Sequence, residues 1–312
     1  MQSFFSASAT TDIKPFPSMS EQTLGGKHED KFSPPLFIFT VIVSLTSILG
    51  LLAWIAPGVW QRQLAAGAGA FTICFVAVHA VAGIFEYFFH RYILHSPLIP
   101  FLSYYYKQHT LHHALTHIGY HRSKQTNEEV PGLIDNDPIA RNTFPIEVEK
   151  QHEASYFPWY TLILFSLGIT PLLVLGQWLL PNAPVMLAGY IAVTFSLALY
   201  ELVHAVEHWP QDTWDRLIAH PRYGRMWRKA YAFHLRHHAD IRCNEGISGI
   251  FGLPLVDFAL GTYVDPETLY KHGQSVSPAQ FNSPVPRFAF IRWLDRKADE
   301  AVKSRRAQAR QG

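Results

Sequence analysis

The sequence predicts an all-α integral membrane protein with four transmembrane helices, arranged as two hairpins, and a helical cap on the cytoplasmic side. Three observations support this fold class: four long apolar runs with almost no charge, two very short connections between them, and a composition that is 48% hydrophobic and only 16% charged. An ordinary soluble domain contains about 25% charged residues. The formal net charge of +2 gives no strong basic field, so we expect no nucleic-acid partner.

Each apolar run is long enough to cross a bilayer. A helix needs about 20 residues to span a hydrocarbon core of about 30 Å. The connections are too short to hold a domain, so each pair of runs is expected to form a helical hairpin. The runs cover residues 36–56, 64–89, about 159–180 and about 185–203, and the connections cover residues 57–63 and 181–184.

The two hairpins return both long polar segments, residues 91–158 and 205–312, to the side of the membrane where the N-terminus lies. These segments hold nearly all the Lys and Arg, whereas the short connections contribute only Arg62. The positive-inside rule therefore places both segments and both termini in the cytoplasm. Because no retention or transit signal is evident, we expect a bacterial inner membrane rather than the endoplasmic reticulum.

The composition divides the chain into three parts. Residues 1–33 are polar and rich in Ser and Thr, without a signal-peptide pattern, and are expected to form a disordered tail. Residues 34–284 hold the apolar runs and form the membrane-embedded domain. Residues 285–312 are basic and helix-prone, and we expect a C-terminal tail that faces solvent or lipid headgroups. Two cysteines are too few for a disulfide framework or a cysteine-type zinc site.

Ten of the 17 histidines fall in four short groups. In the two HXXHH triads, positions i, i+3 and i+4 lie within an arc of about 100° on a helix, so the three rings can converge. His90 and His95 are five residues apart and do not share a face of a straight helix. Since Pro97 disfavours helical geometry at Ser96, we expect the second span to end near residues 90–95 and His95 to swing round. The groups are His90 and His95 in HRYILH, His109, His112 and His113 in HTLHH, His204 and His208 in HAVEH, and His234, His237 and His238 in HLRHH.

The number and grouping of these histidines predict a di-metal site in the cap. A neutral imidazole is a ligand for Fe and Zn, and two ions with four or five ligands each require about eight to ten imidazoles. The hairpin topology brings the groups to one face of the membrane, with His90 at the end of the second span and His204 at that of the fourth. A single HXXXH pair is more often a polar helix end than a metal site, but four groups together favour metal binding.

The order HX4H, HX2HH, HX3H, HX2HH resembles that of the fatty acid hydroxylase/sterol desaturase superfamily, and its spacing is most similar to the fatty acid 2-hydroxylase branch. Residues 250–266 (IFGLPLVDFALGTYVDP) also look like the family's C-terminal signature, and the resemblance covers about residues 76–266. It implies that the ten histidines hold two iron ions, with zinc possible in a purified preparation. It also implies that the centre uses O2 and an external electron donor.

The resemblance further implies an oxidoreductase, a monooxygenase that hydroxylates a fatty acyl or sphingolipid-type chain in the bilayer. No cytochrome b5-like domain lies ahead of the core in this sequence, so we expect electrons from a separate cytochrome b5-like protein, ferredoxin or reductase. A sterol C4-methyl oxidase or C5-desaturase, a carotenoid hydroxylase and an acyl desaturase share such histidine groups and remain alternatives. Outside the enzymes, the alternatives are a non-catalytic scaffold and a metal-transport membrane protein, whose ligands would lie near the bilayer midplane.

Three histidines of the loop after the first triad do not map onto the family pattern. His117 continues the i+4 ladder from His109 and His113. His117 and His121 are each either an additional ligand or a loop histidine. The role of His152 stays open.

Several other ionisable residues lie near the ligand groups. Glu86, Glu201 and Glu207 lie within about one turn of ligand histidines and are candidates to accept the second ring N–H of a ligand. Asp257 resembles a family residue, with a role near the site or a purely structural one. His79 lies three turns before His90, where it either lines a channel for the lipid tail or makes a hydrogen bond between helices.

Overall fold

The computed structural model describes residues 34–122 and 137–310, and the predicted disordered tail at residues 1–33 lies outside them. The described residues are mainly helical, with one small two-stranded sheet. Four of the described helices, at the places of the four predicted spans, are long and apolar enough to cross a membrane and are compatible with a multi-pass membrane protein.

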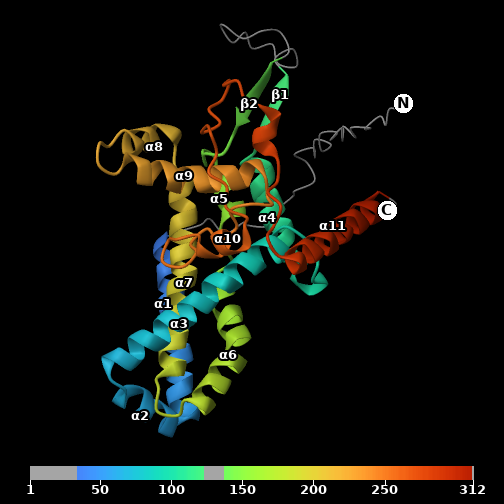
Figure 1. Cartoon of the computed structure of the whole chain (residues 1–312). Helices are drawn as coiled ribbons and strands as arrows, with labels where there is room; N and C mark the ends of the chain where they lie inside the picture. The colour runs from blue at the N-terminus through green and yellow to red at the C-terminus, as the bar shows by residue number, and fades with distance from the viewer. Residues whose placement is uncertain (1–33, 123–136, 311–312) are drawn as a thin grey trace. The chain divides into compact units, whose positions relative to one another are not determined.

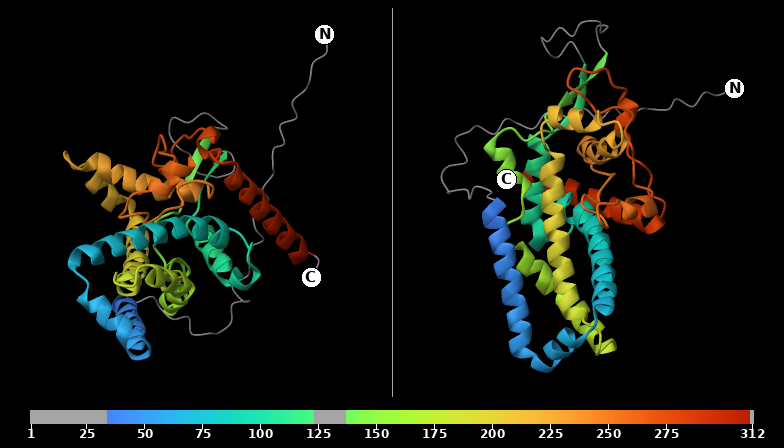
Figure 2. Two further views of the ribbon diagram at one scale, coloured as in Figure 1. Left: turned by 60° about the horizontal axis from the view of Figure 1, so that its bottom comes forward. Right: turned by 90° about the vertical axis from the view of Figure 1, so that its left-hand side faces the viewer.

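The four long helices consist almost entirely of apolar residues. They are α1 (Pro34–Ile55), α3 (Ala68–Phe89), α6 (Thr161–Leu179) and α7 (Val185–Glu207), and α3 continues into a π-helical turn, η2 (His90–Leu94). Helix α7 packs against each of the other three (Figure 2). Outward-facing side chains such as Trp54 and Trp178 are 79% and 76% exposed. Such a surface is suited to lipid rather than to water.

The two connections meet at one end of these helices (Figure 1). The first is itself a short helix, α2 (Pro57–Ala65), with proline in its first turn, where the missing N–H costs nothing. The side-chain amide of Gln63 donates to Gln177 Oε1 at 2.8 Å, and Gln63 Oε1 accepts from the Leu187 backbone N–H at 3.1 Å. Arg62 Nε donates to the Pro181 carbonyl at 3.2 Å. Both hairpins therefore turn at the same end.

The remaining described helices form a cap at the other end (Figure 1). The long interval between the HAVEH and HLRHH groups is filled by α8 and the first half of α9. The cap helices are α4 (Ser103–Leu115), α5 (Glu149–Ser155), α8 (Gln211–Ile218), α9 (Gly224–Ala239), α10 (Leu255–Leu260) and α11 (Ala289–Ala309), with 3-10 turns at Pro100–Leu102 and Pro278–Phe281.

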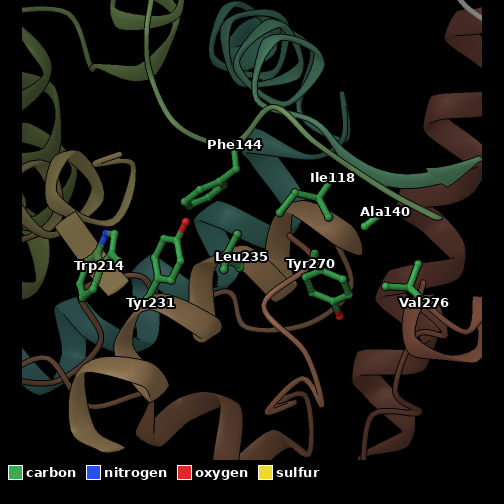
Figure 3. Close-up of a cluster of buried hydrophobic side chains, with 8 residues drawn as sticks. All are labelled: Ile118, Ala140, Phe144, Trp214, Tyr231, Leu235, Tyr270 and Val276. Atoms are coloured by element: carbon green, nitrogen blue, oxygen red, sulfur yellow. The ribbon is translucent and has the colours of Figure 1, made fainter. Parts of the chain in front are cut away.

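A two-stranded antiparallel sheet departs from the predicted all-α class. Strand β1 (Ile118–Arg122) pairs with β2 (Pro138–Asn142), and Ile118 lies opposite Asn142. Short strands with so few apolar residues leave no clear alternation in the sequence, so packing decides their conformation. Their buried residues join a cluster contributed by distant segments: Ile118, Ala140, Phe144, Trp214, Tyr231, Leu235, Tyr270 and Val276 (Figure 3).

Helix α11 covers most of the segment predicted as a basic, helix-prone tail. Its first half packs against the rest of the domain, because Ile291 and Ala298 are fully buried. Arg91 Nε donates to Asp295 Oδ1 at 2.9 Å, which fixes α11 beside η2. The start of the C-terminal segment is therefore part of the packed domain.

We expect Gln63→Ala to destabilise the protein by about 1–3 kcal/mol, since it removes the buried hydrogen bond to Gln177 and the acceptor of the Leu187 N–H. Thermal unfolding in detergent measures the effect. Gln61→Ala is the matched control, because Gln61 lies on the same helix and is exposed. Equal effects of the two substitutions would contradict the proposed role of Gln63.

Candidate metal centre

The ten predicted ligand histidines come together in two clusters of five at the cap end of the long helices. Within each cluster the ring nitrogens that could bind a metal ion lie within 4.8 Å of one another. Site A contains His90, His95, His109, His113 and His237, and site B contains His112, His204, His208, His234 and His238. The two sites are neighbours: the His113 ring of site A stacks on the His238 ring of site B at 4.1 Å between centroids.

Each HXXHH triad serves both sites. Relative to position i, position i+4 is turned by about +40° and position i+3 by about −60°. The two positions therefore point to opposite sides of position i. On α4, His109 and His113 join site A while His112 joins site B. Helix α9 does the reverse, with the i and i+4 histidines in site B and His237 in site A. Helix α4 therefore contributes two histidines to site A and one to site B, and α9 contributes one to site A and two to site B.

The other two groups each serve one site. His95 reaches site A because η2 is a π turn, in which the His95 N–H donates to the His90 carbonyl at 3.2 Å. A π turn brings residues five apart onto nearly the same face, and the His90 and His95 ring centroids are 5.0 Å apart. The second span ends at Leu94, within the predicted residues 90–95, and the π turn that forms its last part brings His95 round to site A. His204 and His208 lie in the last turn of α7 and its cap, and both join site B.

The ring nitrogens are spaced as the ligands of one ion would be. In site A, His90 Nε2 is 2.9 Å from His109 Nε2, and His95 Nε2 is 3.0 Å from His237 Nε2. Metal–nitrogen bonds of about 2.0–2.1 Å place neighbouring ligand nitrogens about 3.0–3.4 Å apart. In site B, the spacings are 3.2 Å for His112–His238, 3.2 Å for His204–His112 and 3.1 Å for His234–His208.

The other ring nitrogen of half of these histidines is fixed by a hydrogen bond. A backbone carbonyl can only accept, so the histidine that bonds to it carries its proton on Nδ1 and turns the Nε2 lone pair toward the cluster. Ser155 Oγ donates to the Gln151 carbonyl and therefore accepts from His112. The Nδ1 bonds are His90 to the Glu245 carbonyl at 2.6 Å, His208 to Phe144 at 2.7 Å, His237 to Cys243 at 2.8 Å, His238 to Thr116 at 2.7 Å and His112 to Ser155 Oγ at 2.9 Å. Converging lone pairs repel unless a cation lies between them, so the donor set fits two metal ions.

Burial keeps the rings in the neutral form that binds metal. Desolvation lowers the pKa of His208 to about 3, although its bond to the Phe144 carbonyl opposes the shift. Desolvation, followed by the mutual repulsion of protonated rings, also lowers the pKa of His112 and His234 well below the usual range. His113 in site A is only partly exposed, whereas all five rings of site B are buried.

The predicted carboxylates lie at different distances from the ligands. Glu207 is the closest, with Oε2 3.8 Å from His234 Nδ1. Glu201 Oε1 accepts from the Phe157 backbone N–H at 3.1 Å. Glu86 accepts hydrogen bonds from the Ser248 N–H at 2.8 Å and from the Ser248 hydroxyl, and Ser248 lies in the loop after α9.

Asp257 acts one step away from site A. Its carboxylate accepts from the backbone N–H groups of Glu245 and Gly246, at 3.0 and 2.9 Å, and from the Thr262 hydroxyl at 2.7 Å. These bonds fix the turn whose Glu245 carbonyl holds His90. Asp257 therefore positions a ligand histidine through the backbone.

Sequence reasoning missed Glu245 and its partner Arg91. Both are fully buried, and Arg91 Nη1 lies 2.8 Å from Glu245 Oε1. The second carboxylate oxygen, Oε2, lies 3.8 Å from His90 Nδ1 and 4.0 Å from His237 Nδ1. A buried charge needs a partner, so an arginine directly after a ligand histidine was the available signal, but nothing in the sequence names the partner.

The remaining predicted histidines lie outside both clusters. Helix α4 ends at Leu115, and the Thr116 hydroxyl donates to the His112 carbonyl at 2.6 Å, so the expected helical ladder stops before His117. His121 lies in β1. The Nδ1–H of His79 donates to Ser196 Oγ at 2.8 Å and its Nε2 accepts from the Phe251 N–H at 3.0 Å, which makes His79 a bridge between α3, α7 and a loop.

A pocket of about 260 Å³ opens beside site B. Its wall includes the first turn of α1 and the end of α7, and it reaches the ligand His208. His152 lines it as well, which gives that unassigned histidine a location. Most of the lining is apolar: Phe37, Ile38, Ile146, Leu202, Ala205, Trp209 and Pro210, with Tyr156 and Glu201.

We expect the purified protein to hold about two metal ions per chain and the double variant His234→Ala/His238→Ala to hold about one, because site B then keeps only three ligands. Metal analysis after size-exclusion chromatography measures this. The matched control, His117→Ala/His121→Ala, removes as many histidines outside the clusters and should keep both ions. Equal loss in the two variants would contradict the assignment of the ligands.

We expect Asp257→Asn to weaken metal binding at site A by about 10–100-fold, since changes in groups that orient ligands have effects of this size. Site B should be unaffected. Chelator competition resolves the two ions. Thr262→Ser retains the hydroxyl that donates to Asp257 and serves as the control; equal weakening of both sites in Asp257→Asn would indicate a general loss of structure instead.

No family model matches the chain, and no curated protein or solved structure matches it either. Conclusions about function therefore depend on the chemistry of the two histidine clusters and their place at the end of four apolar helices.

Proposed function

We propose that this chain is an O2-dependent lipid hydroxylase that holds one iron ion in each of sites A and B. The observation that carries the proposal is the arrangement of ten neutral imidazoles, five to a site, at one end of helices suited to a bilayer. The order of the histidine groups, which resembles that of the fatty acid hydroxylase/sterol desaturase superfamily, supports the same reaction class.

The donor set is suited to iron that must change its oxidation state. Imidazole binds Fe and Zn alike, so zinc is expected to compete during purification. Iron, when bound, supplies the chemistry that activates O2, and a separate electron-transfer protein supplies the electrons. We place this donor in the cytoplasm, where the positive-inside rule puts the cap.

The chain's own residues fix the ligands and keep water away from them. Backbone carbonyls of Glu245, Phe144, Cys243 and Thr116 hold four rings in one orientation. Nine of the ten ligand histidines are buried, and only His113 is partly exposed. A buried, pre-oriented centre favours oxidation of a bound substrate over side reactions with water.

The pocket beside His208 supports a lipid substrate. Its apolar walls come from the ends of α1 and α7, where a multi-pass protein meets the headgroup region. Leu202, one of its lining residues, is 60% exposed on the outer face of α7. An acyl chain could therefore pass from the bilayer to site B without crossing water. We favour a fatty acyl or sphingolipid-type chain on this ground and on the spacing of the histidine groups.

The enzymatic alternatives use the same centre: a sterol C4-methyl oxidase or C5-desaturase, a carotenoid hydroxylase and an acyl desaturase. Metal transport is less compatible with the geometry. A transporter needs ligands near the bilayer midplane, whereas both sites lie at the ends of α3 and α7. His79, near the middle of α3, has both ring nitrogens engaged.

The iron-loaded protein, given a reductant, an electron-transfer protein, candidate lipids and 18O2, should produce lipid that carries one 18O atom. Mass spectrometry of the extracted lipid measures the label. His234→Ala/His238→Ala is the control and should yield none. A new double bond without label would instead identify a desaturase, and unchanged lipid despite full iron loading of the protein would sink the proposal of an oxygenase.

A further inference from the structure

The loop between α9 and α10 carries a short apolar stretch whose side chains face outward. Residues 246–256 read GISGIFGLPLV and contain no charge. Phe251, Leu253 and Leu255 are 48%, 54% and 45% exposed. Exposed apolar side chains this close together are unfavourable in water and need a partner.

This loop follows one face of α3 for about two turns. His79, Gly83 and Glu86 stand at i, i+4 and i+7 and therefore share that face. His79 accepts from the Phe251 N–H at 3.0 Å, and Glu86 accepts from the Ser248 N–H at 2.8 Å. At Gly83 a Cβ would lie 2.8 Å from Ile250 Cγ1, so glycine permits the close approach.

The tip of the loop lies at mid-length of two long helices. His79 is the twelfth of 22 residues in α3, and its partner Ser196 is the twelfth of 23 in α7. Phe251 bonds to His79 and its ring lies 6.1 Å from that of Phe195, which precedes Ser196. Along α3, His79 is eleven residues from His90, or about 16 Å at 1.5 Å per residue. The loop therefore descends from the level of site A to the middle of the helices.

The backbone N–H groups of the loop are hydrogen-bonded, as those of a segment in hydrocarbon must be, because lipid offers no acceptor. Left-handed backbone at Gly249, Phe251 and Gly252, with φ of 51°, 54° and 77°, makes the tight turn that allows this. Glu86 and His79 accept from three of the N–H groups: Ser248, Gly249 and Phe251. Of the others, Ile247 donates to the Glu245 carbonyl, and the rest bond within the loop: Gly252 to the Ser248 carbonyl, Ile250 to Leu253, Leu253 to Ile250 and Leu255 to Leu253.

We propose that residues 247–255 form a re-entrant loop that enters the hydrocarbon region of the membrane beside α3 and α7. The partner of its exposed side chains is lipid acyl chain. The side of α3 that faces away from the loop is also exposed and apolar near the same depth, where Val81, Ile84 and Phe85 are 45%, 47% and 50% exposed. The inference depends on the proposed membrane embedding and adds a fifth inserted element to the four spans.

The re-entrant loop is attached directly to the metal centre. The Asp257 carboxylate binds the N–H groups of Glu245 and Gly246, so the two ends of the loop are clamped together. The Glu245 carbonyl at that clamp holds the ligand His90. One segment thus joins the lipid phase to site A.

Site-directed spin labelling tests the depth of the loop in the full-length protein. We use a Cys74→Ala background, in which Cys243 stays unlabelled because it is fully buried. A nitroxide is attached at Leu253→Cys in phosphatidylcholine vesicles. References are Val81→Cys, on the opposite side of α3 from the loop, and Tyr223→Cys, which is 44% exposed in the cap. Collisions with O2 report hydrocarbon and collisions with a water-soluble nickel chelate report water.

The expected result is loss of nickel collisions and gain of O2 collisions at position 253, as at position 81 and unlike position 223. A second label at Leu255→Cys should agree with it. If positions 253 and 255 behave as position 223 while position 81 stays protected, the loop is outside the membrane and this inference is overturned. If position 81 itself collides with nickel, the membrane embedding has failed, and with it the premise of the proposed function.

Discussion

Mutual repulsion among converging imidazole lone pairs is the constraint on which the arrangement of the cap depends. Ten histidines from α3 with η2, α4, α7 and α9 direct ring nitrogens toward two points. Neutral, and buried in nine of the ten cases, these rings repel one another unless cations lie between them. Metal binding should therefore be coupled to docking of the cap on the long helices, because each site takes its ligands from three separate stretches of chain, which must meet for that site to exist.

The features predicted correctly from the sequence are those that depend on neighbouring residues alone, such as helical periodicity. The four spans and the four histidine groups were found at their observed places. The division into sites A and B was not, because it depends on which neighbour faces each side of α4 and α9. Nor were the acceptors that orient the rings: Glu245, Phe144, Cys243 and Thr116 contribute backbone carbonyls. Every residue has a carbonyl, so no residue type signals this role.

Ionisable residues inside apolar spans give a related lesson. Glu86 and His79 were selected as functional candidates because an ionisable residue inside a membrane span usually has a function. Sequence reasoning linked Glu86 to the metal ligands, and His79 either to a lipid channel or to a hydrogen bond between helices, of which the bond to Ser196 is present. The contacts place both against backbone N–H groups of one loop. A polar side chain in a membrane helix can thus be required by irregular backbone nearby, which hydropathy does not reveal.

The buried pair of Arg91 and Glu245 lies directly behind the histidines of candidate site A. Arg91 follows His90 on η2, and its guanidinium bridges Glu245 in the loop after α9 and Asp295 on α11. Removing one member of a buried ion pair leaves an uncompensated charge, so loss of Glu245 or of Arg91 should destabilise the protein. Because Glu245 also holds His90 through its carbonyl, α11 stabilises the orientation of a site A ligand from the C-terminal end of the chain. The metal centre and the C-terminal helix therefore form one structural unit.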